Sequence, residues 1–407
     1  MSLGWKKDRK MFLGVCGGIA AYKAPELTRE FVRYDWEVEM ALTQAAERFV
    51  SPLVVSTLSG KRVWLEKDFL SPEEGWKIPH INIAEWADIT VIAPATASFL
   101  HKAAWGDASD LISAAILATR KPVLIFPAMN VFMWEHGAVR ENARRCRDLG
   151  YQVFEPEEGF LACGYEGKGR LPSTEIIREE VFRALEPRKD MSGIRVLVTS
   201  GPTREAIDPV RFISNPSSGK MGLSLARTCW YRGAEVTMIT GPVAESPPHG
   251  VRVINVISAD DMYEAAMEEA PSHDIIVKAA AVGDFSPSSF STSKIKRREG
   301  KPLVLEMVPN RDIAAALGAS RRPGQFIVGF AAETEDPVEN AMGKLRKKGL
   351  DLIVVNDVSG PEGAFGSDSN SVRIIGCEGV LSSVEGSKED VAEAIWDVVA
   401  RRRRERG

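Results

Sequence analysis

Cysteine and histidine are few and widely separated in this 407-residue sequence. The five cysteines contain no Cys-x-x-Cys pair, and the five histidines form neither a His-x-x-x-His nor a His-Glu-x-x-His pattern. Such spacing provides neither a disulfide framework nor a zinc site. We therefore expect reduced thiols, a cytoplasmic protein and no tightly bound structural metal.

Long apolar runs and an excess of basic charge are also absent. No stretch approaches the ~20 consecutive apolar residues of a membrane-spanning helix, and the polar, basic segment 1–10 does not have the features of a signal peptide. Lysine and arginine number 52 against 56 acidic residues, so the formal net charge is −4. Proteins that bind nucleic acid through a broad basic surface are usually much more basic. We expect neither a membrane nor a nucleic acid as partner.

What the sequence contains is two successive series of alternating strand and helix patterns. The polar segment 186–193, which carries proline and glycine, separates them. In the first series the expected strands are 11–16, 37–42, 89–93 and 123–126, and the expected helices are 19–32, 44–50 and 108–119. In the second series the expected strands are 194–199, 235–240, 274–277, 326–328 and 352–355, with a helix at 218–232. This pattern predicts two α/β domains, 1–190 and 191–407. In the first, strands that alternate with helices imply a parallel sheet covered on both faces.

A glycine turn follows the first expected strand. Gly17 and Gly18 precede a helix that begins at Ile19, where free backbone N–H groups and the helix dipole favour an anion. The spacing is not Gly-x-Gly-x-x-Gly, and a tight packing turn explains the glycines equally well. Thr43 and the segment 94–98 follow two other strands, at the sheet edge where α/β proteins bind ligands. Together these strand ends predict one shared cofactor site.

Three further residues of the first half carry reactive or polar groups. His80 lies in a short helical stretch, and Asn130 ends the segment Pro-Ala-Met-Asn after a strand. Cys163 lies in the glycine-rich segment 159–170, where a thiol is more accessible than in a core. Without further evidence, His80 also fits a structural role and Cys163 an incidental one.

The segments GGIAAYK, HINIAEWAD, PATAS, PAMN and ACGYEGKGR occur in this order over residues 11–170. They resemble the phosphopantothenoylcysteine decarboxylase half of bifunctional coenzyme A biosynthesis proteins, which belongs to the homo-oligomeric, FMN-containing cysteine decarboxylases. The resemblance implies that His80 is the active-site base, that Asn130 holds the substrate carboxylate and that Cys163 protonates the intermediate. The FMN contacts that it implies are Gly17, Gly18, Ile19, Thr43, Pro94, Ala95, Thr96, Ser98, Ala128 and Met129.

The chemistry that this resemblance implies requires a flavin. A carboxylate on a saturated carbon has no electron sink, so it does not leave easily. A flavin can oxidise the neighbouring thiol to a thioaldehyde, CO2 can then leave to give an ene-thiolate, and the reduced flavin returns the electrons.

The second half contains a long loop that leads into a helix at Ile213-Ser-Asn-Pro-Ser-Ser-Gly-Lys-Met-Gly222. It does not match the Gly-x-x-x-x-Gly-Lys-Ser/Thr phosphate loop. Ser217, Gly219 and Gly222 nevertheless stand at a helix start, where nucleotide phosphates can bind. Lys294 begins a basic cluster within the polar segment 286–300, which we interpret as a functional flap, with a solvated surface loop as the alternative.

With residues 279–285, 309–312, 329–334 and 355–358, these segments resemble the phosphopantothenate–cysteine ligase half of the same bifunctional family. The resemblance implies that CTP activates the carboxylate of 4'-phosphopantothenate as an acyl-cytidylate, which the amine of L-cysteine then attacks. It also implies Mg²⁺ with CTP, without identifying metal ligands, and catalytic roles for Asn215 and Lys294. The nucleotide- or substrate-binding residues that it implies are Ser217, Gly219, Gly222, Ala280, Ala281, Asp284, Asn310, Phe330, Lys344, Lys348 and Asn356.

The resemblance further implies the fold and the assembly. It implies a three-layer flavodoxin-like or Rossmann-like flavoprotein domain followed by a three-layer Rossmann-like ligase domain. It implies trimers of the flavin domain, dimers of the ligase domain and a dodecamer overall. Two alternatives are an FMN-dependent reductase and a non-catalytic flavin-binding scaffold, each fused to a nucleotide-binding domain. The combination of His80, Asn130 and Cys163 argues against both, because neither function needs all three groups.

Overall fold

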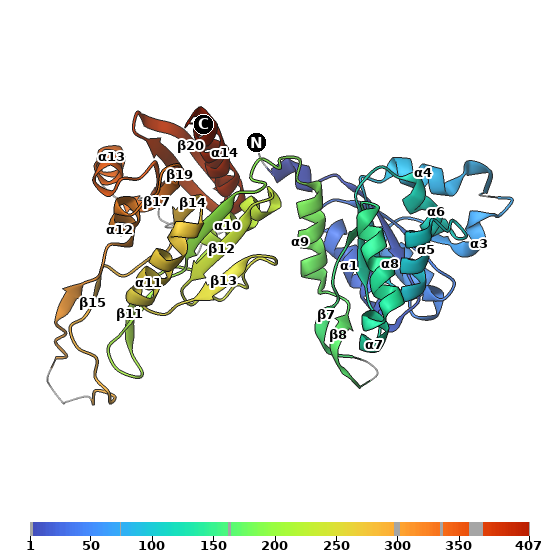
Figure 1. The fold of residues 1–407 in the computed structure, drawn as a ribbon, viewed down its shortest axis with the longest axis horizontal. Helices are drawn as coiled ribbons and strands as arrows, with labels where there is room; N and C mark the ends of the chain where they lie inside the picture. The colour runs from blue at the N-terminus through green and yellow to red at the C-terminus, as the bar shows by residue number, and fades with distance from the viewer. Residues whose placement is uncertain are drawn as a thin grey trace. The chain divides into compact units, whose positions relative to one another are not determined.

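The computed structural model describes residues 3–73, 75–161, 164–296, 302–333, 337–357 and 369–406. The chain forms two compact units (Figure 1). The N-terminal unit comprises Gly4–Leu185, and the C-terminal unit comprises Glu186–Gly407 with Met1–Leu3. Among the described residues, none of the helices is both long and apolar enough to cross a bilayer.

The N-terminal unit is built on a six-stranded sheet in the order β3-β2-β1-β4-β5-β6, and all its strand pairs are parallel. The strands are β1 (Lys10–Val15), β2 (Glu37–Leu42), β3 (Val63–Leu65), β4 (Ile89–Ala95), β5 (Val123–Pro127) and β6 (Gln152–Val153). Every residue of β4 is buried, so both faces of the sheet are covered. The order reverses between β1 and β4, which is the Rossmann arrangement and not the flavodoxin order.

Helices and a small ribbon complete this unit. The helices are η1 (Leu3–Lys6), η2 (Ile19–Lys23), α1 (Ala24–Val32), η3 (Ala46–Arg48), α2 (Pro52–Ser59), α3 (Glu66–Phe69), η4 (Gly75–Lys77), α4 (Pro79–Trp86), α5 (Ala97–Trp105), α6 (Leu111–Ala118), α7 (Val131–Glu135), α8 (Gly137–Asp148) and α9 (Thr174–Leu185). The antiparallel ribbon consists of β7 (Glu157–Phe160) and β8 (Glu166–Arg170). Helix α4 packs against α6, and α5 packs against α8.

The expected helix at 44–50 is wrong. Only the short turn η3 forms there, and the helix follows it as α2. Ser51 is extended (φ −72°, ψ 129°), and Pro52 occupies the first turn of α2. Proline lacks an N–H and has a fixed φ, so it favours a helix start over a helix interior. Helix α6 likewise begins at Leu111 and not at residue 108, because the Asp110 carboxylate caps it by accepting the N–H of Ser113 at 2.8 Å.

The C-terminal unit has an eight-stranded sheet in the order β13-β12-β9-β14-β17-β18-β19-β20. The strands are β9 (Arg195–Ser200), β12 (Glu235–Thr240), β13 (Arg252–Asn255), β14 (Ile275–Lys278), β17 (Phe326–Glu333), β18 (Leu352–Asp357), β19 (Ser369–Gly376) and β20 (Gly379–Ser387). The pairs from β13 to β18 are parallel, with the order reversing between β9 and β14. The prediction of two α/β folds is therefore confirmed.

The sheet of this unit is not wholly parallel. Strand β19 pairs antiparallel with β18, and β20 pairs antiparallel with β19. A connection as short as the one between Gly376 and Gly379 can only join antiparallel neighbours, since a parallel pair needs a long crossover.

The remaining elements of this unit are helices and two small ribbons. The helices are α10 (Lys220–Tyr231), α11 (Ala259–Glu269), η5 (Ala270–Ser272), α12 (Ile313–Ala319), α13 (Pro337–Lys348) and α14 (Lys388–Arg406). The ribbons are β10 (Arg204–Ala206) with β11 (Phe212–Ser214), and β15 (Phe285–Pro287) with β16 (Met307–Pro309). The segments around β11 and β15 extend away from the large sheet (Figure 1).

Candidate functional site

Each unit has a cavity at the carboxyl ends of its parallel strands, beside the point where the strand order reverses. This is the position at which open α/β sheets bind ligands. The cavity of the N-terminal unit has a volume of about 400 Å³. It is lined by Gly17, Gly18, Ile19, Ala20, Tyr22, Lys23, Thr96, Ala97, Ala128, Met129, Asn130, Met133, Phe160, Leu161, Gly169, Arg170 and Leu171.

The glycine turn after β1 forms one wall of this cavity. A Cβ on Gly17 would stand 2.3 Å from the Cβ of Ala45, so a side chain there would push the loops apart. A Cβ on Gly18 would meet nothing within 4 Å, so this residue leaves open space. The neighbouring Cys16 is buried, and burial raises the pKa of its thiol to about 12. The thiol therefore stays neutral beside the turn.

The segment that carries Asn130 is fixed from two sides. The N–H of Ala128 donates to the carbonyl of Ala95 at 3.0 Å, and the N–H of Met129 donates to the carbonyl of Gly169 at 3.0 Å. Asn130 caps α7, because its Oδ1 accepts the N–H of Phe132 at 2.9 Å. This arrangement holds the Asn130 side chain at the cavity wall.

Two cations in this cavity were not identified from the sequence. Lys23 donates from Nζ to the carbonyl of Leu171 at 3.0 Å, and Arg170 ends strand β8. Burial, with the charge of Arg170 added, lowers the pKa of Lys23. Sequence analysis singled out neither residue, since only folding brings η2 and the β7–β8 ribbon together. The pair gives the cavity a positive end suited to a phosphate or a carboxylate.

The structure brings together only part of the predicted flavin-binding and catalytic residues of this half. Gly17, Gly18, Ile19, Thr96, Ala128, Met129 and Asn130 line the cavity, whereas Thr43, Pro94, Ala95, Ser98 and His80 do not. Pro94 and Ala95 are buried in β4, and Ser98 is exposed on α5. Cys163 lies outside the described residues.

His80 occupies a different environment. It lies on α4, where its ring packs edge-on against Phe69 with 5.5 Å between centroids. Its buried Nδ1 has no hydrogen-bond partner within the described ranges. In this chain His80 is therefore not one of the groups that face the cavity.

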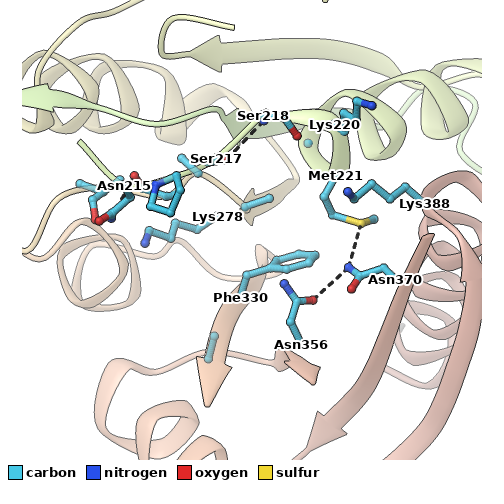
Figure 2. A pocket seen from close by; sticks show the side chains of 18 residues that line it. Asn215, Ser217, Ser218, Lys220, Met221, Lys278, Phe330, Asn356, Asn370 and Lys388 are labelled. Carbon is cyan, nitrogen blue, oxygen red and sulfur yellow. Dashed lines mark hydrogen bonds between the residues drawn. The ribbon is translucent and has the colours of Figure 1, made fainter. Parts of the chain in front are cut away.

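The cavity of the C-terminal unit has a volume of about 350 Å³ (Figure 2). It combines the loop before α10, the end of β14 and the ends of β17 and β18. The predicted residues that line it are Asn215, Ser217, Gly219, Gly222, Ala280, Ala281, Phe330 and Asn356. Residues that sequence analysis did not single out also line it, among them Met221, Lys278, Asn370 and Lys388.

Helix α10 begins at this cavity. Gly219 adopts a left-handed conformation (φ +75°) that favours glycine, and its N–H donates to Ser217 Oγ at 3.3 Å. A Cβ on Gly222 would lie 2.4 Å from Ser200 Oγ, so this glycine lets the helix approach β9. The N-terminus of a twelve-residue helix presents backbone N–H groups and a positive dipole end to the cavity.

Three amide side chains contribute to the cavity wall. Asn215 donates from Nδ2 to the carbonyl of Val282 at 3.0 Å, which holds the loop against the turn after β14. Across Phe330, Asn370 donates to Asn356 Oδ1 at 3.1 Å and approaches the Met221 sulfur at 3.9 Å (Figure 2). Asn370 belongs to the antiparallel strand β19, so no motif of the parallel strands indicated it.

Five predicted residues of this half lie outside the cavity lining: Asp284, Lys294, Asn310, Lys344 and Lys348. Asn310 donates to the carbonyl of Gly283 at 2.9 Å, and Lys348 forms an ion pair with Asp312 at 2.9 Å. Lys294 is exposed, and the N–H of the next residue, Ile295, donates to Asp208 Oδ2 at 3.1 Å. Across the parts of the chain that the structure describes, no group of three or more His, Cys, Asp or Glu side chains could hold a metal ion.

Comparison with known proteins relates both units to one family. Residues 2–186 match the family model described as Flavoprotein, and residues 191–402 match the model of the DNA/pantothenate metabolism flavoprotein C-terminal domain. The chain is 42% identical over 394 residues to the coenzyme A biosynthesis bifunctional protein CoaBC of Vibrio cholerae, covering 96% of this chain and 98% of that protein. It is 43% identical over 395 residues to the protein of the same name from Bacillus subtilis, covering 95% and 96%. A crystal structure of the C-terminal domain of a CoaBC protein is 36% identical, covers 52% of this chain and 97% of that one, and has a TM-score of 0.44.

Proposed function

This chain belongs to the family of coenzyme A biosynthesis bifunctional proteins, and from that membership we propose two consecutive reactions. The C-terminal unit joins 4'-phosphopantothenate to L-cysteine with consumption of CTP. The N-terminal unit then converts 4'-phosphopantothenoylcysteine to 4'-phosphopantetheine and CO2 with FMN. The observation that carries the proposal is the 42% identity that extends over 96% of the chain and therefore includes both units.

The ligase reaction needs an activated carboxylate. A carboxylate oxygen of 4'-phosphopantothenate attacks the α-phosphorus of CTP, and the bond to pyrophosphate breaks. The cysteine amine then attacks the acyl carbon and CMP leaves. Negative charge accumulates on the departing groups, and the α10 N-terminus and the cavity lysines are suited to stabilise it. Asn215, which lines the cavity and donates to the carbonyl of Val282, is proposed to orient the reacting carboxylate.

Mg²⁺ and the predicted flap enter this reaction as proposals. Mg²⁺ is proposed to arrive on the phosphate oxygens of CTP, as part of the substrate. Lys294 is proposed to stabilise the departing pyrophosphate. Because Lys294 lies outside the cavity lining, segment 286–296 must move toward the nucleotide for this contact to form.

The N-terminal cavity fits FMN in the chemistry of its lining. Apolar side chains suit a flavin ring, Gly18 leaves open space, and Lys23 and Arg170 suit a phosphate. When bound, FMN supplies the oxidation of the substrate thiol that makes loss of CO2 possible. Asn130 is proposed to hold the substrate carboxylate, and Cys163 is proposed to donate the proton during the final reduction.

The position of His80 bears on the assembly. Since His80 does not line the cavity of its own chain, a role as active-site base requires that a second copy present it. Exposed apolar residues near α4, Leu70 (84% exposed) and Trp76 (74%), are suited to contact between copies. We therefore propose that the protein is a homo-oligomer. From the family resemblance we further propose trimeric N-terminal units, dimeric C-terminal units and a dodecamer overall. We also propose that the protein is cytoplasmic.

The test is to supply 4'-phosphopantothenate, L-cysteine and CTP to the purified protein. Pyrophosphate, CO2 and 4'-phosphopantetheine should all form, and the protein should carry the yellow colour of FMN. If pyrophosphate forms but CO2 does not, the decarboxylase half of the proposal is wrong. A yellow protein that forms none of these products would instead favour the reductase or the scaffold.

A further inference from the structure

Lys278 is a cation at the end of a buried parallel strand. The strand β14 reads Ile-Ile-Val-Lys, and its other three residues are fully buried. Lys278 itself is half-buried and lines the C-terminal cavity (Figure 2). Its side chain extends toward the side of the cavity where Asn215 lies (Figure 2). It therefore faces the space in which a ligand would bind.

The Lys278 ammonium has no partner among the residues that the structure describes. Within the described ranges it makes no hydrogen bond or ion pair. The nearby carboxylate of Asp312 is already paired with Lys348, at 2.9 Å. Lys220, at the rim of the same cavity, differs because it forms an ion pair with Glu245 at 3.4 Å.

The surroundings of Lys278 disfavour its charge. Burial is the main cause that lowers its pKa, and the charges of Lys348 and Lys344 add to it, while Asp312 and Asp284 oppose it only in part. An ammonium that is removed from water without a partner costs free energy. Asp312 and Asp284 offset that cost only in part, and an anion in the cavity would offset more of it.

We propose that Lys278 binds a phosphate oxygen of the nucleotide in this cavity, which adds a binding residue to the set that the motifs indicated. The inference rests on the proposed ligase function. The nucleotide is favoured as the source of the phosphate because the same cavity contains the N-terminus of α10, with Gly219 and Ser217 at its start. Lys278 and the N-terminus of α10 both line this cavity, so a phosphate group in it would be bound by the two together.

The test compares Lys278→Met with the wild-type protein in calorimetric titrations with CTP. Methionine keeps the length of the side chain and removes the charge. CTP should bind at least about 10-fold more weakly, since the loss of one partner of a buried charge pair costs a few kcal/mol. Lys347→Met removes a charge of the same kind from an exposed position outside the cavity and should bind CTP like the wild type.

Two further measurements separate binding from folding. Without ligand, Lys278→Met should melt at a higher temperature than the wild type, because it no longer desolvates an unpaired charge. At alkaline pH, the wild type should take up protons when CTP binds, and Lys278→Met should take up fewer. A purely structural role would lower the melting temperature and leave proton uptake unchanged.

Unchanged CTP affinity in Lys278→Met would overturn the inference. Weaker binding of 4'-phosphopantothenate alone, measured in a separate titration, would also overturn it. In that case the phosphate that Lys278 binds would belong to the acyl substrate. Failure of the proposed function looks different: the wild-type protein itself would neither bind CTP nor release pyrophosphate from it.

Discussion

Arg232 and Glu393 form an enclosed ion pair in the C-terminal unit, with 3.3 Å between Nη1 and Oε2 and each side chain 1% exposed. Arg232 follows helix α10, and Glu393 lies on α14. Arg188 joins the pair by donating to Glu393 Oε2 at 2.8 Å, and Asp190 accepts from Arg232 at 2.7 Å. The segment that follows α9 is therefore attached to both helices by charged groups.

Arg232→Met should destabilise the C-terminal unit by about 3–5 kcal/mol, because it leaves Glu393 and Asp190 without their shared partner. Urea denaturation of the whole protein, followed by fluorescence, measures this loss. Arg252→Met is the matched control: Arg252 is 63% exposed and pairs with Glu269 at 2.8 Å, so its removal should cost less than about 1 kcal/mol. Equal effects in the two variants would contradict a special role for the enclosed pair.

Glu393→Gln should change the pH dependence of stability. Burial of the carboxyl raises the pKa of Glu393 to about 7, although Arg188 opposes the shift. In the unfolded chain a glutamate has a pKa of about 4.3, so the folded state binds the extra proton between these values. The stabilisation of the folded state by this proton is therefore complete below about pH 4.3, and it is lost as the pH rises through 7.

The measurement is the difference in unfolding free energy between Glu393→Gln and the wild type from pH 4.5 to 8. Glutamine cannot ionise, so the difference should grow in favour of the variant, by up to about 3 kcal/mol. A difference that stays constant, or that grows in favour of the wild type, would show that the arginines keep Glu393 ionised.

Gly17→Ala and Gly18→Ala should have different effects on the N-terminal unit. A methyl group on Gly17 would collide with Ala45, at 2.3 Å, so this variant should lose ~1–3 kcal/mol of stability and retain less FMN. Gly18 has open space, so Gly18→Ala should fold normally. Melting temperature and the flavin absorbance per chain are the two readouts. Normal stability of Gly17→Ala would contradict the tight contact.

Cys163→Ser should stop the N-terminal reaction after CO2 has left. A serine hydroxyl is a much weaker acid than a thiol, so protonation during the final reduction should fail. Mass spectrometry should then find the ene-thiol, lighter than the normal product by a pair of hydrogen atoms. Cys377→Ser, which changes an exposed thiol of the other unit, should give the normal product. Normal turnover of Cys163→Ser would remove Cys163 from the mechanism.

Lys294→Gln should abolish pyrophosphate release and spare the decarboxylation of supplied 4'-phosphopantothenoylcysteine. The loss of one electrostatic contact to the departing group corresponds to a decrease on the order of 10²–10³-fold. Lys296→Gln changes an exposed lysine of the same segment and should keep most of the ligase activity. A wild-type rate of pyrophosphate release would make Lys294 an ordinary surface residue. A fall in both activities would contradict the independence of the two sites.

The local elements follow from the sequence because their signals are local. The expected strand 37–42 coincides with β2, and the expected strand 235–240 coincides with β12, because short segments rich in apolar and β-branched residues favour strands. The motif glycines lie at cavities for a related reason: the carboxyl ends of parallel strands share one edge, so residues that follow different strands meet there.

Contacts between distant segments were decided only by the tertiary structure. Lys278 directly follows the expected strand 274–277, and only the folded chain shows that its ammonium faces a cavity without a partner among the described residues. Asn370 reaches Asn356 because β19 returns antiparallel, which no pattern in the parallel strands indicates. His80 and Lys294 have the expected residue types and yet lie outside the cavity linings, because a motif specifies chemistry and local structure but not which surface faces which. The sequence by itself determined the elements and the kind of chemistry, through short-range backbone preferences and residue types. Strand order, the antiparallel edge and the partners of each charged group depended on long-range packing, which only the folded chain establishes.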